Sequence, residues 1–460
     1  MSTTLVLTEE LAAQLLTMAR LPIETGAVLL ARPVGSPENS FRLLANTLVP
    51  VPDDAYERRT SHSLSILSHG YVPALRDAEQ REAIAIWLHT HPGDGASPQH
   101  SDHDVVVDRQ LSDLFRLRSG SAYYGSVVVS HRNNHLCFSG HLETPENRFA
   151  IQRLLTVGAR LSLVLTDGAD SPPMDSLFDR NIRAFGGDIQ RVLAELRVAI
   201  VGCGGTGSAV AEQLVRLGVR HFIAIDPDSL SESNLTRVYG SGPSDVGRKK
   251  VDVLADSLAR IAPAVVVERV PSMVTVERTA RRLADADVIF GCTDDNAGRL
   301  VLSRIATYLM KVVIDCGVLL TTDSAGHLTG IDGRVTMVHP GAACLVCRDR
   351  IDLARAASEL LTPEERLRRE DEGYAPALIG IEPAVVTFTT SVAACAVGEL
   401  LEKLARFGPE PVPSEILLRL HDREISTNIQ SSRERHYCHP ASGKIGLGMT
   451  VPFLEQLWQG

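Results

Sequence analysis

Residues 197–228, RVAIVGCGGTGSAVAEQLVRLGVRHFIAIDPD, constrain the fold of this chain more than any other stretch. An apolar run leads into a glycine-rich turn at Gly202, Gly204 and Gly207. An amphipathic helix follows, and a second apolar strand ends at Asp226, 19 residues after Gly207. Such glycines let backbone N–H groups and a helix N-terminus approach a phosphate, and the carboxylate can bind a ribose hydroxyl. The pattern predicts a nucleotide-binding strand–helix–strand unit but does not separate NAD from ATP.

The composition limits what else the chain can be. A length of 460 residues, with 44% hydrophobic and 22% charged residues, predicts two or three globular domains with sizeable cores. A net charge of −10 argues against nucleic-acid binding. The N-terminus lacks a signal-peptide pattern, and the apolar run 384–397 is shorter than a membrane span. We therefore expect a cytoplasmic protein without membrane or nucleic-acid partners.

The chain divides into two parts at a segment rich in turn residues, TDGADSPPMD. We expect a first domain at 1–160, a linker at 161–176 and a second domain at 177–460. The first domain alternates short strands and helices, including a helix capped by Thr8. The second has strands near residues 197, 221, 265, 287 and 311, separated by helical patterns. The fold class is therefore α/β, with a mostly parallel Rossmann-like sheet in the second domain.

The first domain contains residues of the types that a catalytic zinc ion uses. His89 and His91 end a predicted strand two positions apart, so their imidazoles lie on one face. With Asp104 they make three ligands and leave a fourth position for water. Glu24, just before a strand, is the candidate proton shuttle, and Ser101 could donate a hydrogen bond to an oxyanion. Ser101 and Asp104 also have the spacing of a helix capping box, and both roles can coexist.

The order H-T-H-P followed by S-x-x-D resembles the JAB/JAMM zinc metalloproteases, over about the first third of the chain. Members of that family cleave isopeptide or peptide bonds at the C-terminus of ubiquitin-like proteins. The resemblance implies His89, His91 and Asp104 as zinc ligands, Glu24 as general acid/base and Ser101 as oxyanion stabiliser. The loop after His91 is longer than the usual pattern. It offers further candidate ligands in Asp94, His100, Asp102 and His103.

The second domain carries charges that suit ATP better than NAD. Arg237 and Lys250 are cations for a triphosphate, and Asp294 follows a predicted strand, where it could hold Mg²⁺. An NAD oxidoreductase has no need of this set. Taken singly, Asn234 and Arg237 are explained as well by a role in shaping a loop as by nucleotide binding. Lys250 alone is explained as well by a place on a solvated helix. Their combination favours ATP.

Together these residues resemble the adenylating domain of ubiquitin-activating enzymes and their bacterial ThiF/MoeB relatives. The matching order is the glycine turn, D-x-D, S-N-L-x-R, G-x-x-K and C-T-D, with Arg299 five residues after Asp294. The resemblance assigns the nucleotide, with its phosphates and Mg²⁺, to Gly202, Gly204, Gly207, Asp226, Asp228, Asn234, Arg237, Lys250 and Asp294. Arg180 matches an arginine that the partner subunit supplies, which implies a homodimer. Asn181 and Val238 stand where the family usually has glutamine.

The implied reaction is attack of a carrier protein's C-terminal carboxylate on the α-phosphate of ATP. It gives an acyl-adenylate and pyrophosphate, mostly by positioning and charge neutralisation. The resemblance also places the first half of a structural zinc site at Cys344 and Cys347. The second half is Cys438 with either His436 or His439, since the usual second Cys-x-x-Cys is absent.

A covalent step after adenylation lacks an evident cysteine. Residues 348–394 contain none, and Cys395 falls in an apolar helical pattern. Cys203, Cys292 and Cys316 are interpreted as packing residues. The enzyme then either stops at the adenylate and passes it to a conjugating-enzyme-like acceptor, or uses a hydroxyl such as Ser358 or Thr362.

These observations predict a bifunctional enzyme. The second domain would adenylate a ubiquitin-like protein, and the first would mature that protein or remove it from its targets. Such fusions resemble components of bacterial ubiquitin-like conjugation operons, some linked to antiphage defence. One alternative is activation of a sulfur carrier for cofactor or cysteine biosynthesis. The others are a binding scaffold in which one domain is a pseudoenzyme, and NAD oxidoreduction.

Overall fold

The computed structural model describes residues 2–36, 40–94, 98–166, 176–325, 327–361, 365 and 384–458. The chain forms two compact units. Unit 1 is Met1–Ser171 with Gly446–Met449, and unit 2 is Pro172–Ile445 with Thr450–Gly460. The predicted linker therefore began too early, because residues 161–165 form a strand of unit 1. The described residues do not include residues 167–175 of the predicted linker, and they do not include Thr362.

Unit 1 consists mostly of strands. Its strands are β1 (Ser2–Thr8), β2 (Gly26–Gly35), β3 (Ser40–Pro50), β4 (Tyr56–Arg59), β5 (Leu64–Ile66), β6 (Ile84–Asp94), β7 (Tyr124–Arg132), β8 (His135–Glu143), β9 (Arg148–Val157) and β10 (Leu161–Leu165). Its helices are α1 (Glu9–Ala19), α2 (Val72–Gln80) and α3 (Asp102–Ser119), with 3₁₀ turns at Asp53–Ala55 and Ser68–Gly70. The helix after Thr8 is confirmed, because the Thr8 side chain accepts a hydrogen bond from Leu11 N at 3.2 Å.

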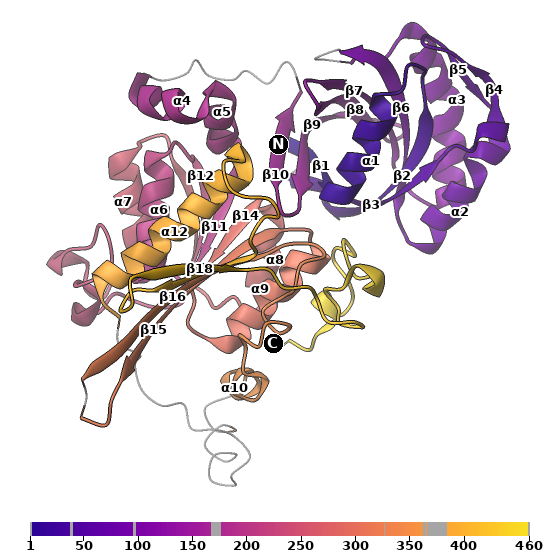
Figure 1. The fold of residues 1–460 in the computed structure, drawn as a ribbon. Helices are drawn as coiled ribbons and strands as arrows, with labels where there is room; N and C mark the ends of the chain where they lie inside the picture. Colours follow the sequence, from indigo (N-terminus) through magenta and orange to yellow (C-terminus); the bar gives the residue numbers. More distant parts are fainter. Residues whose placement is uncertain are drawn as a thin grey trace. The chain divides into compact units, whose positions relative to one another are not determined.

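The strands of unit 1 close on themselves. The sheet order is β1-β3-β2-β6-β7-β8-β9-β10, and β1 also pairs with β9. Among the described residues this makes a barrel-like ring of seven strands, with β10 attached to β9 (Figure 1). The sequence predicted alternating strands and helices instead. It missed β1, β3 and β9. The strand β1 pairs with β3 and β9, which lie far from it in the sequence, so no local pattern reveals this closure.

Side-chain alternation divides the core of unit 1 between the two faces of the sheet. On β6, Ile84, Ile86 and Leu88 join the cluster beneath α1, whereas Ala85 and Trp87 join the cluster beneath α2 and α3. Because successive side chains of a strand point to opposite faces, His89 points to the same face as Trp87. The histidines therefore emerge on the face that α3 covers.

Unit 2 alternates strands and helices. Its strands are β11 (Arg197–Val201), β12 (His221–Ile225), β13 (Val266–Val270), β14 (Val288–Gly291), β15 (Val312–Thr322), β16 (Leu328–Val338), β17 (Glu415–Arg419) and β18 (Glu424–Asn428). Its helices are α4 (Asp179–Phe185), α5 (Gly187–Glu195), α6 (Gly205–Arg216), α7 (Lys250–Ile261), α8 (Glu277–Arg282), α9 (Asn296–Tyr308), α10 (Leu353–Glu359) and α12 (Val386–Ala405). Short 3₁₀ turns lie at Ser176–Phe178, Glu232–Asn234, Pro243–Asp245, Leu283–Asp285, Pro440–Ser442 and Phe453–Glu455.

The sheet of unit 2 is parallel in one half and antiparallel in the other. Its order is β13-β12-β11-β14-β15-β16-β17-β18. The first five strands are parallel, which confirms the predicted strands and the Rossmann-like α/β class. The antiparallel extension of β16, β17 and β18 was not predicted. Helices α6, α7 and α12 cover one face of the sheet and α8 and α9 the other (Figure 1).

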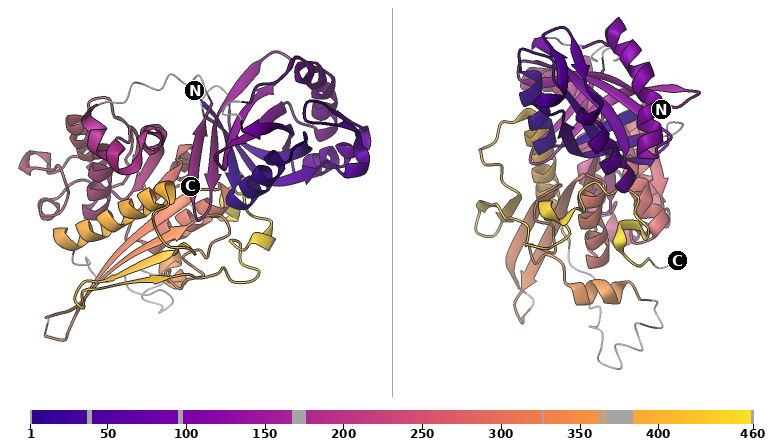
Figure 2. Two further views of the ribbon diagram at one scale, coloured as in Figure 1. Left: turned by 45° about the horizontal axis from the view of Figure 1, so that its top comes forward. Right: turned by 90° about the vertical axis from the view of Figure 1, so that its right-hand side faces the viewer.

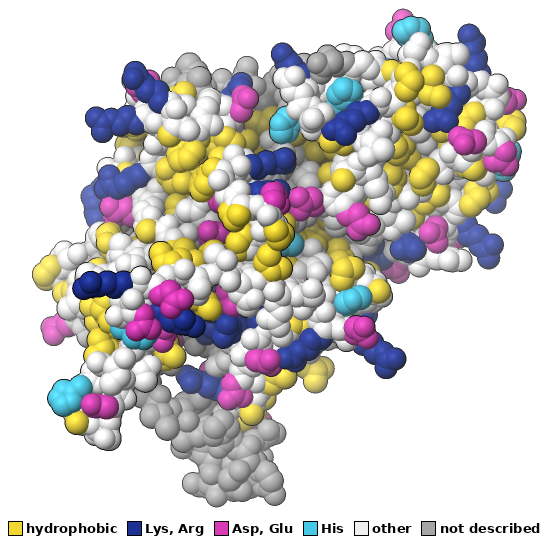
Figure 3. Space-filling model, in the orientation of Figure 1, with side chains coloured by type: hydrophobic (Ala, Val, Ile, Leu, Met, Phe, Trp, Pro, Cys, Tyr) yellow, Lys and Arg dark blue, Asp and Glu magenta, His cyan; other side chains and the backbone are white. Residues whose placement is uncertain are grey.

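The β15–β16 hairpin extends beyond the rest of unit 2 (Figure 2). On the face of unit 2 seen in Figure 3, acidic and basic side chains are interspersed rather than segregated. Within the described part of the chain, no helix is long and apolar enough to cross a membrane.

Candidate functional sites

The glycine turn of unit 2 is shaped by close backbone packing. Gly202 has φ +93°, and a Cβ at that position would lie 2.6 Å from the carbonyl oxygen of Cys292. A Cβ on Gly207 would lie 1.9 Å from the carbonyl oxygen of Gly202. Gly204 is the N-cap of α6. Gly202 and Gly207 are therefore required for the turn, and a Cβ at Gly204 would meet no neighbouring atom within 4 Å, so the N-terminus of α6 is open to an anion.

Asp226 and Lys250 form a charged pair beside this turn. The Asp226 carboxylate accepts hydrogen bonds from Cys203 N at 2.7 Å and from Asp228 N at 2.9 Å. Burial raises the pKa of Asp226, and the nearby Lys250 ammonium opposes that rise. Lys250 Nζ lies 4.0 Å from Asp226 Oδ1 and 2.7 Å from Asp228 Oδ2. The pair can offer a carboxylate to a ribose and a cation to a phosphate from one place.

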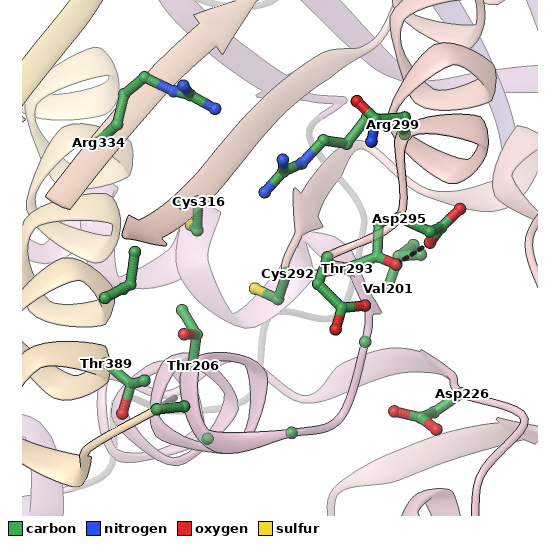
Figure 4. A pocket seen from close by; sticks show the side chains of 18 of the residues that line it. Val201, Thr206, Asp226, Cys292, Thr293, Asp295, Arg299, Cys316, Arg334 and Thr389 are labelled. Atoms are coloured by element: carbon green, nitrogen blue, oxygen red, sulfur yellow. Dashed lines mark hydrogen bonds between the residues drawn. The ribbon is translucent and has the colours of Figure 1, made fainter. Parts of the chain in front are cut away.

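A cavity of about 900 Å³ opens at the carboxyl ends of the parallel strands (Figure 4). Of the predicted nucleotide residues, its lining includes Gly202, Gly204, Asp226, Asp228, Arg237, Lys250 and Asp294. The Asp294 side chain is exposed, and Arg237 Nη1 donates to Ser233 O at 3.0 Å. Ligands of open α/β sheets bind at this end of the strands. Seven of the residues predicted to bind the nucleotide therefore lie around one cavity.

Three predicted residues are outside the cavity lining. Gly207 is buried within α6. Asn234 is buried, and its Oδ1 accepts a hydrogen bond from Ser231 N at 3.1 Å, so it caps its own turn. Arg180 is exposed on α4. The nucleotide roles of these residues, like those of the residues that line the cavity, stay predictions.

The opposite wall of the cavity holds a charge network that the sequence analysis missed, apart from Arg299. Asp315 is fully buried, with Arg299 Nε and Arg334 Nη2 each 3.4 Å from its oxygens. Glu415, also fully buried, accepts two hydrogen bonds from Arg350, at 2.9 and 3.1 Å. An aspartate within the apolar strand VVIDCG was the available signal, because buried carboxylates need cationic partners.

Four metal-ligand side chains converge in the C-terminal part of unit 2. Cys344, Cys347, Cys438 and His436 place one ligand atom each within 4.8 Å of the others. His436 Nδ1 lies 3.3 Å from the Cys347 sulfur and 3.2 Å from the Cys438 sulfur. His439 accepts a hydrogen bond from Ala441 N at 3.1 Å and caps a turn. Of the two predicted alternatives, His436 is therefore the one beside the cysteines, and the set suits zinc.

In unit 1, His89, His91 and Asp104 converge in a similar way. The two Nε2 atoms lie 3.2 Å apart, and Asp104 oxygens lie 3.2 Å from His89 Nε2 and 3.4 Å from His91 Nε2. Burial raises the pKa of Asp104, but hydrogen bonds with both histidines outweigh it and hold that pKa well below its usual range. The ligand atoms suit one divalent cation with an open position, which would polarise a bound water.

Glu24 and Ser101 border this cluster. Glu24 precedes β2, whose Gly26 pairs with His89 on β6. The Glu24 side chain is buried, which raises its pKa, and the charges of His89 and His91 oppose that rise. Ser101 caps α3, and its Oγ lies 2.8 Å from Asp104 Oδ2 in the capping box. The structure thus places all five predicted residues together, with Ser101 also serving as a cap.

Unit 1 contains a second polar cluster. The sequence analysis named only one of its members, His100, as a candidate ligand. His100, Asp108 and His141 face one another, and Tyr124 donates to Asp108 Oδ1 at 2.7 Å. Burial lowers the pKa of His141 to about 3, and the Arg148 charge adds to this. Arg148 Nη2 lies 2.8 Å from His141 Nδ1, and an arginine can only donate. His141 Nε2 must then carry the proton, which disfavours this cluster as a metal site.

Comparison with known proteins agrees with the architecture of unit 2. The family model described as "ThiF family" matches residues 178–439, more than half of the chain. A doubly wound sheet with a glycine turn and a cavity at its carboxyl edge defines a nucleotide-binding α/β protein. The chain belongs to the ThiF family.

Two relatives illustrate the range of similar proteins. The chain is 31% identical over 170 residues to the molybdopterin-synthase adenylyltransferase of Escherichia coli, covering 37% of this chain and 65% of the relative. It is 26% identical over 184 residues to ubiquitin-like modifier-activating enzyme 5 of Arabidopsis thaliana, covering 36% and 41%. The chain thus spans less than two thirds of the length of either relative.

A solved structure, that of E. coli MccB with ATP, is similar at a TM-score of 0.44 and 17% identity. It covers 58% of this chain and 76% of that one. At this level the likeness adds nothing to the family match.

Proposed function

We propose that unit 2 adenylates the C-terminal carboxylate of a ubiquitin-like or sulfur-carrier protein with ATP. The observation that carries this proposal is the cavity that Asp226, Arg237, Lys250 and Asp294 line together with the N-terminus of α6. The E. coli relative is named an adenylyltransferase, and the plant relative a modifier-activating enzyme, which supports the same chemistry.

In this reaction a carboxylate oxygen attacks the α-phosphorus of ATP. The bond from that phosphorus to the β-phosphate bridging oxygen breaks, and pyrophosphate leaves. Arg237 and Lys250 would neutralise the phosphates, and Asp226 would hold the ribose. Mg²⁺, for which Asp294 is the candidate ligand, would supply further charge neutralisation when bound. Catalysis then rests on positioning, because the acyl-adenylate forms without a protein nucleophile.

The test is exchange of labelled pyrophosphate into ATP by the full chain with a ubiquitin-like protein that ends in Gly-Gly. We expect exchange in the wild type and a loss of at least ~100-fold in Asp294→Ala, since a charge-stabilising group is removed. Asp422→Ala, an exposed carboxylate between β17 and β18, is the matched control. Exchange that persists in Asp294→Ala would contradict the assignment.

We propose that unit 1 is a zinc peptidase that processes or deconjugates the same protein. The convergence of His89, His91 and Asp104 beside the buried Glu24 supports it. His89 and His91 would hold the metal with Asp104. Glu24 would move a proton between the attacking water and the leaving amine, and Ser101 would face the oxyanion.

This second activity is tested on a fusion of a ubiquitin-like protein to a reporter through its C-terminal glycine. His89→Ala should lose one zinc ion and the cleavage, whereas His69→Ala, an exposed histidine, should keep both. Cleavage at the wild-type rate in His89→Ala would contradict the assignment of His89 as a zinc ligand. Asp294→Ala should cleave normally, because the two sites use separate residues.

The remaining predictions complete this proposal. Cys344, Cys347, Cys438 and His436 would hold a structural zinc ion. Arg180 would reach the nucleotide of a second copy in a homodimer, and a conjugating-enzyme-like protein would accept the adenylated carrier. A sulfur-carrier role is the second candidate, favoured by the molybdopterin-synthase relative. Transfer of sulfur to the adenylate by a sulfurtransferase would distinguish it.

A further inference from the structure

Two arginines of the cavity wall face each other (Figure 4). Arg299, on α9, and Arg334, on β16, extend their guanidinium groups toward one another (Figure 4). Their side chains are 16% and 20% exposed, so each is mostly buried with its end in the cavity. Neither is one of the two cations, Arg237 and Lys250, that are proposed to neutralise the ATP phosphates.

Gly317 leaves a small space between these two guanidinium groups. It pairs directly with Arg334 across β15 and β16. A Cβ at Gly317 would lie 3.3 Å from Arg334 Nη2 and 3.6 Å from Arg299 Nη2. Since glycine has no side chain, both nitrogens border one niche in the cavity wall. We call Arg299, Arg334 and Gly317 the arginine niche.

The niche carries positive charge that its own carboxylates do not cancel. Asp315 contacts Arg299 and Arg334, and Glu415 contacts Arg334, Arg348 and Arg350. Glu415 accepts its short hydrogen bonds from Arg350, so Arg299 and Arg334 share mainly the single carboxylate of Asp315 and the niche keeps a net positive charge. Arg299 Nε and Asp315 Oδ1 lie 3.4 Å apart as an ion pair without a hydrogen bond between them. Because buried charge of one sign is costly, an anion in the niche would be favourable.

We propose that the arginine niche binds the C-terminal carboxylate of the protein substrate before adenylation, a role that rests on the function proposed for unit 2. Two guanidinium nitrogens suit the two oxygens of a carboxylate. The ATP phosphates have their own cations in Arg237 and Lys250, at the glycine turn. Neutralising the carboxylate would reduce its repulsion by the triphosphate and so allow its approach to the α-phosphorus. Arg299 and Arg334 are thus specificity-determining residues for a free carboxyl terminus.

The test compares two synthetic peptides that end in Gly-Gly, one with a free carboxylate and one with a C-terminal amide. Their dissociation constants are measured on the full chain by competition with the labelled acid peptide. The wild type should prefer the acid by about 10-fold or more, as expected for charge-assisted hydrogen bonds. In Arg299→Ala and Arg334→Ala this preference should fall below ~3-fold. A wild type without preference overturns the proposal.

Two further variants separate the niche from general damage. Gly317→Ala keeps both arginines but fills the space between them, and it should also lose the preference. Arg419→Ala removes another arginine of the cavity lining, one that pairs with the exposed Glu424, and should keep it. If Gly317→Ala, Arg299→Ala and Arg334→Ala all keep the wild-type preference, the niche does not bind the carboxylate.

ATP affinity distinguishes a carboxylate from a phosphate as the occupant. The three niche variants should bind ATP within about 2-fold of wild type. ATP binding weakened as much as acid-peptide binding would overturn the proposal in favour of a phosphate. Pyrophosphate exchange separates this inference from the proposed function. Exchange without acid preference defeats the niche alone, whereas acid preference without exchange defeats the adenylation and leaves the niche standing.

Discussion

The two candidate zinc clusters of this chain are built in opposite ways. In unit 2, three buried cysteines and His436 make a closed set of four ligands from segments about ninety residues apart. In unit 1, His89, His91 and Asp104 make a set of three, and the His91 side chain is 27% exposed. A closed set has no place for a reactant, and an open one does. The comparison predicts that one metal maintains the fold and the other serves chemistry.

Removing a ligand of the closed set should have the largest effect. Cys347→Ser should lose one zinc ion and destabilise unit 2 by about 3–5 kcal/mol, because metal binding ties distant segments together and leaves buried polar groups when lost. Metal analysis and urea unfolding measure this, together with pyrophosphate exchange. His91→Ala is the counterpart in unit 1. If the two substitutions destabilised their units equally, the distinction between a structural metal in unit 2 and a catalytic metal in unit 1 would fail.

Glu24→Gln should change chemistry without changing metal content. The amide keeps the shape of the side chain but cannot carry a proton, so cleavage should fall by about 10²–10⁴-fold. Zinc content and the free energy of unfolding should stay close to wild type. Glu10→Gln, an exposed position on α1, is the control. Loss of zinc in Glu24→Gln would show that Glu24 holds the metal rather than moves protons.

Acid should weaken unit 1 through His141. Burial lowers the pKa of His141 to about 3, below the usual 6.5. The unfolded state then binds more protons, so stability falls as the pH decreases from 6.5 toward 3. Between pH 7.5 and 4.5 this one group should cost about 3 kcal/mol.

Urea unfolding of unit 1 at the two pH values measures that cost, and His141→Gln should remove it from the pH dependence. The same loss in wild type and His141→Gln would assign the acid sensitivity to other groups. Loss of zinc from either cluster is monitored in parallel, because ligand protonation also releases metal.

The smallest expected effect concerns the cap of α1. Thr8→Ala removes the hydrogen bond to Leu11 N and should destabilise unit 1 by about 1 kcal/mol. Thermal unfolding should show a lower transition for unit 1, while pyrophosphate exchange by unit 2 stays unchanged. If pyrophosphate exchange by unit 2 were lost at the same lower temperature as the fold of unit 1, the two units would unfold as one.

Local patterns were predicted well wherever neighbours in the sequence decide the structure. The glycine turn, the helix after Thr8 and the parallel strands of unit 2 follow from nearby residues, since turns, caps and periodicity are local properties. The barrel-like closure of unit 1 was missed, because the pairing of β1 with β9 joins strands about 150 residues apart. The early linker boundary has the same cause, since β10 is recognised as a strand only through β9.

The sequence by itself determined the residue types of the sites: the H-T-H with S-x-x-D order, the glycine turn, and the pair Cys344 and Cys347 with the later Cys438. Tertiary structure decided which of those residues meet. It chose His436 over His439, set Asn234 to capping its own turn, and brought Arg299 and Arg334 together at Gly317. The physical reason is that ligand convergence depends on strand pairing and helix placement across long sequence separations, whereas residue types and local turns do not.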